Sequence, residues 1–527
     1  MSAVVIVVPS LLLLFLGYRY YARRIERIWG VDPKRATPAF SKYDSVDYIP
    51  AKNWLVLFGH HFSSISGAGP VIGPVIAVIF WGWLPALLWV VLGTIFIGGV
   101  HDFGSLITSV REGGSSVADI SRHVISRRTK VIFSMFLWLT LLLIVAVFAY
   151  LCADTFVKDP RIVLPSLGLI PVAIAVGYLV YQARFNIALA TVLGLVCVGG
   201  LMFAGNRYTI HLDVRIWVIV LLIYCYFASI LPVNILLQPR DYLSSFFLFF
   251  GVACGYLGLV LTSPRLNMPA YQGWQSDAGY LWPALFVTVA CGALSGFHSL
   301  ISSGTSSKQL ANERYARRIG YGGMVAEALV AVLAIVVTAV LFSGPLSPGQ
   351  TLKALGPINI FGKGYGIITK PILGSHGHFI AIIILNIFIL TTLDTATRIQ
   401  RYITEELFGI KNRYISTLVI VILGAGLALS GKWSRIWLAF GAANQLVAAL
   451  ALFVVSCWLL MKNKTTAFTL WAGFAVLITT VAALLLQGAR YFAQRDIVLL
   501  VITAVLLSLA GVMLYDVLAV IKRKAKA

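Results

Sequence analysis

Six titratable side chains stand inside apolar stretches of the sequence, where a charged group is costly and usually functional. They are His60, His61, His101, Asp102, His298 and Glu327. At a helical rise of about 1.5 Å per residue, all lie roughly 12–15 Å from the same end of their apolar runs. A carboxylate that faces histidines in a low dielectric is suited to relaying a proton. We therefore predict that His61 and Asp102 handle a proton, while Glu327 fits an ion pair and the relay equally well.

A run of hydroxyl groups follows His298, namely Ser299, Ser302, Ser303, Thr305, Ser306 and Ser307. At helical spacing, such hydroxyls often bond back to carbonyls of their own helix or hold neighbouring helices together. The alternative is a cation site at Ser299, Ser302 and Ser303, completed by carbonyl oxygens that a broken helix sets free. The sequence leaves both open, and with them the choice between a proton and a sodium ion.

The other polar groups in apolar runs have simpler explanations. Adjacent helical residues point about 100° apart, so we predict that one of His60 and His61 is functional and the other makes a packing hydrogen bond. Asp394 is predicted to pair with Arg398, four residues on. Asp516 lies close to the basic tail and is predicted to reach the membrane surface. The six cysteines form no CxxC pair and are predicted to be small buried residues.

The segment from Trp54 to Ile76, WLVLFGHHFSSISGAGPVIGPVI, is apolar enough to cross a membrane but unsuited to one continuous helix. Glycine loosens the helical backbone, and proline removes a donor and clashes with the preceding turn. Backbone groups freed inside a membrane are tolerated only against protein or a water-filled cavity. We therefore predict a broken helix at a substrate site, with binding residues His60, His61, Ser64, Ser66, Gly67, Gly69, Pro70 and His298.

The 527 residues are 59% hydrophobic and 11% charged, with a mean hydropathy of +0.90, which excludes a soluble globular protein. Long apolar runs recur along the chain, so we predict an all-α polytopic membrane protein. Most of the 41 Lys and Arg lie in alternate loops, which places the N-terminus outside and the C-terminus in the cytoplasm of a plasma (inner) membrane protein. Lipid, and not nucleic acid, therefore accounts for the net charge of +22.

The predicted spans begin with a retained, uncleaved helix at 2–21. The others are 53–80, 84–109, 131–154, 164–181, 186–204, 215–237, 242–262, 282–307, 320–343, 376–397, 413–430, 435–461, 466–487 and 496–521. The outer segments 263–281 and 344–375 are rich in Gly and Pro and are predicted to cap a vestibule.

A second interrupted helix is predicted at 215–237, where Pro232 and Asn234 stand in an apolar run. It lies five spans after the broken helix, so the two begin five-helix sets of opposite topology, the best sequence sign of a transporter site. Pro232 and Asn234 are accordingly predicted substrate ligands. The predicted divisions are 1–50 (first helix and basic loop), 51–241 (first repeat and start of the sixth helix), 242–410 (rest of the inverted repeat) and 411–527 (accessory helices).

Four motifs in this order resemble the carbon starvation protein A (CstA) family: GHHFSSISGAGPVIGPV, HDFGSLITSVREGGSSVADI, ACGALSGFHSLISSGTSSKQLANE and LDTATRIQRYITEEL. The resemblance covers about residues 50–410. It implies a leucine-transporter (LeuT) type fold of inverted five-helix repeats, with one extra N-terminal and about four extra C-terminal helices. It also implies peptide transport in nutrient starvation, or pyruvate uptake with protons. His60, His61, Gly67, Gly69, Pro70, Asp102, His298 and Ser303 fall in its motifs.

These observations predict a secondary importer of small carboxylate-bearing nutrients, short peptides first, driven by protons or alternatively sodium ions. The substrate is predicted between spans 53–80, 131–154, 215–237 and 282–307, with its carboxylate on the amides of Gly67 to Gly69. A proton-coupled pyruvate symporter is the first alternative. An intramembrane metal or haem redox protein using His60, His61, His101 and His298 is the second, and a channel or sensor the third. No GxxxxGK[ST] loop is present, and neither enzymatic activity nor a cofactor or metal is predicted; the oligomeric state is open.

Overall fold

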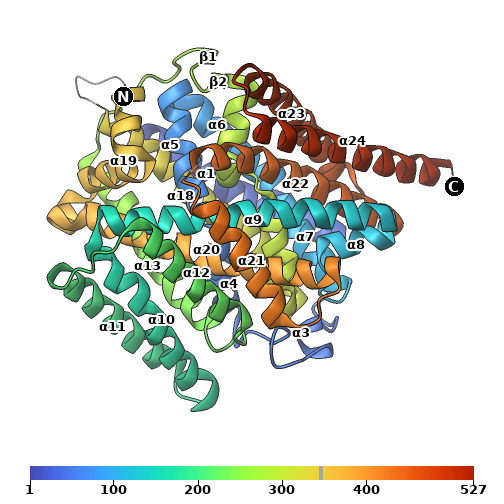
Figure 1. Ribbon diagram of the computed structural model, residues 1–527, viewed down its shortest axis with the longest axis horizontal. Helices are drawn as coiled ribbons and strands as arrows, with labels where there is room; N and C mark the ends of the chain where they lie inside the picture. The colour runs from blue at the N-terminus through green and yellow to red at the C-terminus, as the bar shows by residue number, and fades with distance from the viewer. Residues whose placement is uncertain (343–347, 432, 527) are drawn as a thin grey trace.

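The computed structural model describes residues 1–342, 348–431 and 433–526 as a bundle of helices (Figure 1). Eleven described helices are long and apolar enough to cross a membrane, a bent pair adds one span, and two shorter apolar helices accompany them. The one described sheet is a hairpin of β1 (Gln275–Ser276) and β2 (Gly279–Tyr280). The predicted polytopic helical protein is therefore confirmed.

The predicted broken helix is present as α4 (Trp54–Ile65) and α5 (Gly69–Trp81), which meet at 44°. The side chain of Asn53 caps α4 by accepting a hydrogen bond from the amide of Val56. Ser66 leaves the helical conformation, with φ −82° and ψ 53°. Pro70 stands in the first turn of α5, where a missing N–H costs nothing. The break therefore falls where glycine and proline predicted it.

The second interrupted span is not the predicted one. Pro232 and Asn234 lie in the turn between α12 (Val214–Ile230) and α13 (Leu237–Thr262), because the residue before a proline is pushed into extended backbone and ends the helix. The chain breaks instead between α15 (Ala290–Ala293) and α16 (Gly296–Ile301), where Leu294 and Ser295 are extended. This span also contains η5 (Leu281–Leu285), α14 (Phe286–Thr288), η6 (Ser302–Ser306) and α17 (Ser307–Gln309).

The two broken spans pack against each other at the centre, α5 on α15 and α4 on α16. Around them, α9 (Arg127–Lys158) packs along α20 (Gly377–Phe408), and α7 (Gly99–Arg111) along α18 (Ala316–Leu341). Likewise, α12 packs on α21 (Arg413–Ala428). The second helix set was predicted to begin with span 215–237, whereas the second broken span of the structure lies at residues 281–309.

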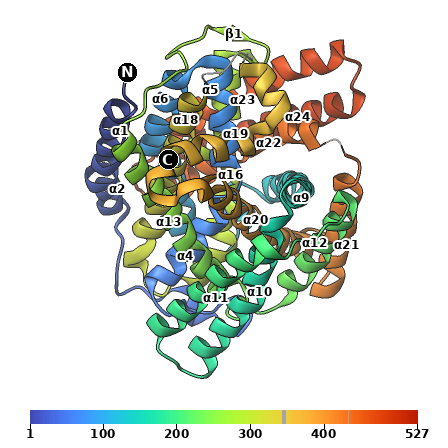
Figure 2. The same cartoon turned by 90° about the vertical axis from the view of Figure 1, so that its left-hand side faces the viewer.

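The remaining helices surround this centre (Figures 1 and 2). The N-terminal part comprises α1 (Val4–Leu16), η1 (Gly17–Tyr21), α2 (Ala22–Trp29), α3 (Pro38–Ser41), α6 (Trp83–Gly93), η2 (Thr94–Gly98) and α8 (Val117–Val124). A hairpin follows α9, made of η3 (Pro160–Ile162), α10 (Val163–Gly177), η4 (Tyr178–Gln182) and α11 (Ile187–Arg207). Further on lie η7 (Glu313–Tyr315), η8 (Gly374–His376), α22 (Trp433–Met461), α23 (Ala467–Ala493) and α24 (Ile497–Lys526).

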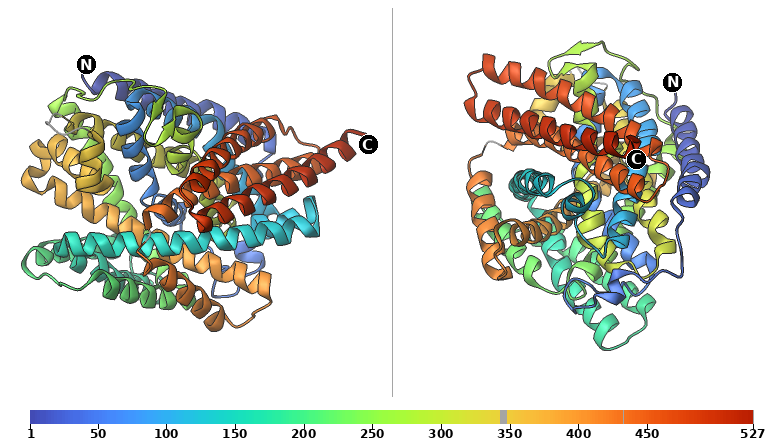
Figure 3. Two further views of the ribbon diagram at one scale, coloured as in Figure 1. Left: turned by 45° about the horizontal axis from the view of Figure 1, so that its top comes forward. Right: turned by 90° about the vertical axis from the view of Figure 1, so that its right-hand side faces the viewer.

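The outer segment 344–375, predicted to cap a vestibule, is largely helical. Pro348–Leu373 forms α19, kinked at Gly356, and residues 344–347 lie outside the described residues. The positive φ of 74° at Gly356 lets the chain turn and resume a helix at Pro357. The two ends of the chain lie far apart (Figure 3).

The loops sort into two groups at opposite ends of the helices. Val46, in a loop predicted to be cytoplasmic, accepts a backbone hydrogen bond from Val233, near the inner end of the predicted span 215–237. Lys42 donates to the carbonyl of Gly113, and both lie in loops predicted to be cytoplasmic. Segments predicted to lie outside also meet one another, because the amide of Ala3 donates to Pro264. The amide of Leu84 likewise donates to the carbonyl of Ala270. The alternation that the basic residues predicted is thus compatible with the packing.

Candidate functional site

A cavity of about 380 Å³ reaches both helix breaks. Gly69, Cys291 and Asn444 line its deep part, and Asp277 and Arg490 line its other end, beside the β1–β2 hairpin. Its remaining lining residues are Ile76, Phe80, Ala278, Ala284, Val287, Thr288, Ala290, Leu352, Trp437, Phe440, Gly441, Gln487, Tyr491 and Gln494. The predicted outer segment 263–281 therefore does border a vestibule.

A second cavity, of about 400 Å³, shares Ile76, Leu352 and Trp437 with the first. Leu151 and Thr155 of α9 line it. The substrate was predicted between four spans, and three of them, 53–80, 131–154 and 282–307, border these two cavities. The fourth, 215–237, lines neither, which follows from the position of Pro232 in a turn.

Close packing holds the two breaks together. A Cβ atom on Gly69 would stand 2.4 Å from Cβ and Sγ of Cys291. Gly73 is equally confined, because a Cβ there would stand 2.3 Å from the carbonyl oxygen of Thr288. The side chain of Asn444 accepts a hydrogen bond from the amide of Phe297 at 2.8 Å and so caps α16. These glycines serve close approach of the two spans.

The carbonyl groups at the end of α4 are met by threonines of α20. Thr391 donates to the carbonyl of Ser63 at 2.9 Å, and Thr392 donates to that of Ser64 at 3.2 Å. The predicted cation site relied on carbonyl oxygens freed at this break, and these two already accept hydroxyl groups. Ser66 and Gly67 line a separate apolar cavity of about 30 Å³, too small for a peptide.

A buried cluster joins α7, α16 and α18 through His101, Asp102, His298 and Glu327. Oδ1 of Asp102 lies 2.7 Å from Nδ1 of His101, and Oδ2 lies 2.9 Å from Nδ1 of His298. Nε2 of His298 lies 3.1 Å from Oε2 of Glu327, an ion-pair distance without hydrogen-bond alignment. All four side chains are fully buried. The structure thus brings together the predicted Asp102, His298 and Glu327.

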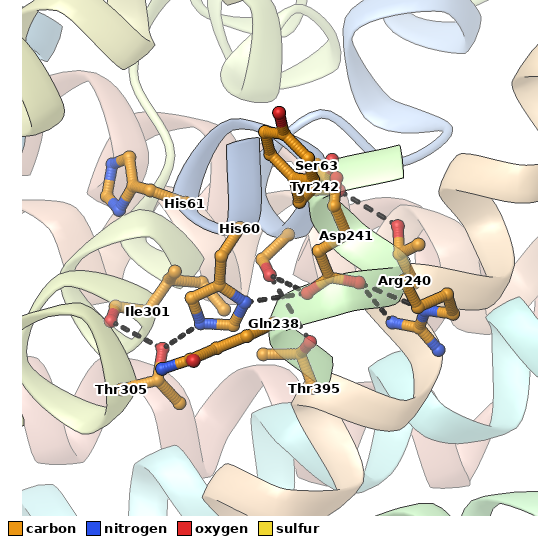
Figure 4. Close-up of polar contacts among 12 residues, drawn as sticks. His60, His61, Ser63, Gln238, Arg240, Asp241, Tyr242, Ile301, Thr305 and Thr395 are labelled. Carbon is orange, nitrogen blue, oxygen red and sulfur yellow. Dashed lines mark hydrogen bonds and ion pairs between the residues drawn. The ribbon is translucent and has the colours of Figure 1, made fainter. Parts of the chain in front are cut away.

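The two adjacent histidines point to different partners (Figure 4). Nδ1 of His60 lies 2.6 Å from Asp241, and its Nε2 lies 3.2 Å from Thr305. Nδ1 of His61 lies 2.8 Å from Ser306, and its Nε2 has no partner among the described residues. His61 therefore does not touch Asp102, and the predicted relay pair is not in direct contact.

His60 belongs to a second buried charged cluster. Asp241 accepts a hydrogen bond from Nε of Arg240 at 3.0 Å, and Nη2 of Arg240 lies 2.9 Å from Asp394 (Figure 4 shows the Arg240–Asp241 contact). Tyr224 donates to Asp394 at 2.6 Å. The prediction that Asp394 pairs with Arg398 is wrong. Asp394 pairs with Arg240 of α13, and Arg398 pairs with Asp47.

Most of the hydroxyl run bonds within its own helix. Ser299, Ser303 and Ser307 donate to the carbonyls of Gly296, Ser299 and Ser303. Ser302 is buried and has no hydrogen-bond partner among the described residues. Of the predicted ligands elsewhere, Ser64 lies 3.4 Å from Asp241 and 3.3 Å from Thr395.

Charged side chains lie at the end of the bundle opposite the 380 Å³ cavity. Nη1 of Arg398 lies 3.0 Å from Asp47, and Nη2 of Arg401 lies 3.5 Å from it. Burial raises the pKa of the Asp47 carboxyl, whereas these two guanidinium groups lower it. With help from Lys308 and a hydrogen bond from Tyr402, they hold that pKa below its ordinary value.

A further carboxylate at this end, Glu313, is fully buried and accepts Arg111 Nε at 2.7 Å and Arg35 Nη1 at 3.1 Å. At the periphery, Asp516 accepts a hydrogen bond from Thr129 at 2.7 Å. Asp516 is half-buried and this bond joins α24 to the start of α9; the prediction that it reaches the membrane surface stays a prediction.

Sequence analysis missed several residues of these sites. Arg240 and Asp241 were assigned to a loop because they precede an apolar run, although an Arg-Asp pair beside such a run is a usable signal. Asn444 and Gln445 interrupt the apolar stretch 435–461 and could have been found in the same way. Cys291 and Ser295 carry no such signal, because small residues are common in membrane helices.

The four histidines of the metal or haem alternative point to separate partners. His60 and His61 face Asp241 and Ser306, whereas His101 and His298 meet at Asp102. Within the described ranges, no three His, Cys, Asp or Glu side chains converge as metal ligands. Their positions give no support to a metal or haem centre.

A family model described as "Carbon starvation protein CstA" matches residues 2–348 and 346–483. Peptide transporter CstA of Campylobacter jejuni is 30% identical, over 91% of this chain and 79% of its own length. Pyruvate/proton symporter BtsT of Escherichia coli is 31% identical, over 89% and 78%. Peptide transporter CstA of Bacillus subtilis is 29% identical, over 86% and 85%.

Among solved structures, a manganese transporter of Eremococcus coleocola has a TM-score of 0.56 at 12% identity, over 92% of this chain and 99% of that one. A histidine-to-alanine mutant of the same transporter has a TM-score of 0.54 at 13% identity, over the same shares. At these identities the likeness concerns the fold alone. It confirms the LeuT-like fold predicted from the sequence.

Proposed function

Because the chain belongs to the carbon starvation protein CstA family and is a membrane transporter, we propose that it imports small carboxylate-bearing nutrients, short peptides first. The observation that carries the proposal is the cavity of about 380 Å³ that reaches both helix breaks. Pockets for small molecules usually measure about 300–1,000 Å³, so a short peptide fits its size.

The deep end of the cavity suits a carboxylate. Gly69 begins α5; Pro70 has no N–H and the amides of Val71 and Ile72 donate to Ala68, so the amide of Gly69 is the donor that this turn offers a ligand. The helix dipole adds a partial positive charge at the same place. Gly69 lines the cavity, although the space beside its Cα is filled by Cys291, so a ligand would meet this turn through its backbone.

We propose proton coupling through the cluster of His101, Asp102, His298 and Glu327. The support is a buried chain of titratable groups that links three helices, one of which, α16, begins directly after the second helix break. A proton that changes the charge of Asp102 would change the pairing of α7 with α16. Sodium coupling remains the alternative, with buried Ser302 as its unpartnered hydroxyl among the described residues.

We further propose that the N-terminus lies outside and the tail inside a plasma (inner) membrane. With this orientation, the 380 Å³ cavity opens to the outside. The ion pairs that Asp47 and Glu313 form with arginines close the cytoplasmic end. Transport inward then requires these ion pairs to separate while the cavity narrows. The proposal needs no cofactor or nucleic acid, and it makes no commitment on the oligomeric state.

Pyruvate uptake with protons is the second candidate, favoured by the similarity to BtsT, which is as close in identity as the peptide transporters. Proteoliposomes that contain the purified protein decide between them. We expect imposed proton gradients to drive uptake of a labelled dipeptide more than of pyruvate. Pyruvate uptake without dipeptide uptake would favour the second candidate, and uptake of neither substrate under proton or sodium gradients would refute both.

A further inference from the structure

The outer end of the 380 Å³ cavity is built partly by α23, which follows the two helix sets in the chain. Gln487, Arg490 and Tyr491 lie on one stretch of α23 and all line the cavity. Opposite them stands Asp277, in the turn between β1 and β2. The side chain of Trp81, at the end of α5, donates to the carbonyl of Gly279 and so ties this hairpin to the broken span.

Two of these side chains have polar atoms without a protein partner. The hydroxyl of Tyr491 and Oε1 of Gln487 are both buried and unpartnered among the described residues. Tyr491 is only 7% exposed. A buried polar atom without a hydrogen-bond partner is costly, so we expect a ligand or a water molecule inside the cavity to form that hydrogen bond.

The two charged groups at this end are also unneutralised. Arg490 donates to the carbonyl of Ala278 at 3.2 Å, and within the described part of the chain neither Arg490 nor Asp277 makes an ion pair. The neighbouring 400 Å³ cavity differs, because its Lys158 lies 2.7 Å from Asp154. One cavity thus offers a separate cation and anion, whereas the other offers a neutralised pair.

From this arrangement we infer that Arg490, Asp277, Tyr491 and Gln487 form an outer subsite that selects zwitterionic substrates. The inference rests on the proposed importer function and names its substrate class, which is an amino acid or short peptide with free ammonium and carboxylate groups. The guanidinium of Arg490 pairs with the carboxylate, and Asp277 pairs with the ammonium group. Tyr491 donates to, and Gln487 accepts from, the part of the ligand between them.

A monocarboxylate such as pyruvate would use only half of this subsite. It would leave Asp277 unpaired next to a second negative charge. Both candidate substrates carry a carboxylate, so that group cannot distinguish them. The subsite distinguishes them by the ammonium group, which only the peptide carries.

Competition against labelled L-alanyl-L-alanine in counterflow tests the inference on the full-length protein in proteoliposomes. The competitors are the unlabelled dipeptide, its N-acetyl form and its C-terminal amide. We expect the wild type to bind each blocked form about fivefold more weakly, because each has lost one contact to an exposed charged side chain. Arg490→Gln should weaken binding of the free dipeptide by about the same factor and leave binding of its C-terminal amide nearly unchanged.

Asp277→Asn should weaken binding of the free dipeptide and leave binding of its N-acetyl form unchanged. Tyr491→Phe removes only the hydroxyl group and should weaken all three peptides. The matched controls are Arg495→Gln, which follows α23 and lies outside the cavity lining, and the exposed Tyr515→Phe on α24. Both controls should behave as the wild type.

The outcomes separate this subsite from the importer function itself. Dipeptide counterflow that Arg490→Gln and Asp277→Asn leave intact would overturn the subsite while the importer proposal stands. Equal competition by free and blocked dipeptides would do the same. Absence of wild-type counterflow with both dipeptide and pyruvate, in protein that remains folded, would instead defeat the importer proposal and the subsite with it.

Discussion

Replacing Asp102 with asparagine tests whether the cluster of His101, Asp102, His298 and Glu327 carries the coupling proton. The change removes a charge and keeps the shape of the side chain. Asp102 contacts His101 at 2.7 Å and His298 at 2.9 Å, using a different oxygen for each. Asparagine has one acceptor oxygen, so its amide group must face one of the histidines in place of a carboxylate oxygen.

At least one charge-assisted hydrogen bond is therefore weakened or lost. Such a bond contributes about 1.5–3 kcal/mol, which corresponds to a change of roughly 10- to 150-fold in an equilibrium constant. We expect the accumulation of dipeptide driven by a pH gradient to disappear. Substrate exchange without a gradient should persist within a few-fold, because Asp102 does not line the cavity.

The assay compares gradient-driven uptake and counterflow in the same proteoliposomes. Asp516→Asn is the control, because that carboxylate also accepts a side-chain hydrogen bond, from Thr129, but lies at the periphery. His61→Ala should lose accumulation as well if the unpartnered Nε2 of His61 belongs to the proton path. Wild-type accumulation in Asp102→Asn would refute the reasoning, and loss of exchange in folded protein would make Asp102 a positioning residue only.

Three further predictions concern packing, buried charge and pH. Gly69→Ala should abolish counterflow and cost about 1–3 kcal/mol, because its Cβ would stand 2.4 Å from Cβ of Cys291, and adding Cys291→Gly should restore transport. Arg240→Met should cost about 3–5 kcal/mol in unfolding experiments in detergent by leaving buried carboxylates uncompensated, and adding Asp394→Asn should recover part of it. Finally, Asp47 has a lowered folded-state pKa, so its stabilising contribution is present above the unfolded value of about 3.9 and disappears as the pH falls through the folded value. The thermal midpoint of the wild type should therefore drop more steeply in acid than that of Asp47→Asn.

Each of these has an opposing result. Transport by Gly69→Ala alone would show that the two broken spans need not approach so closely. An unchanged free energy of unfolding in Arg240→Met would mean that the neighbouring carboxylates are already protonated in the folded protein. Identical acid profiles of Asp47→Asn and the wild type would mean that the charge of Asp47 does not stabilise the fold.

The broken helix illustrates what local sequence can predict. Glycine at 67 and 69 and proline at 70 act on the backbone of their own segment, so the interruption of span 53–80 follows from residue types alone. Asp102, His298 and Glu327 were predicted at one depth because helical rise converts residue number into distance. The same argument could not place Pro232, because a proline near a helix end and one in a break look alike in sequence.

Partners and cavities depended on the tertiary structure. Arg240 and Asp394 are 154 residues apart, and nothing local distinguishes this pair from the predicted one four residues apart. The cavity is bordered by parts of the chain from Gly69 to Gln494, and only their packing makes a common surface. Composition therefore determined that this chain is a helical membrane protein, and glycine and proline determined its broken span, because burial and backbone preference act locally; the transporter prediction rested on that break and on the family resemblance. Tertiary packing alone decided which charges pair and where a ligand can enter, because those depend on contacts between distant segments.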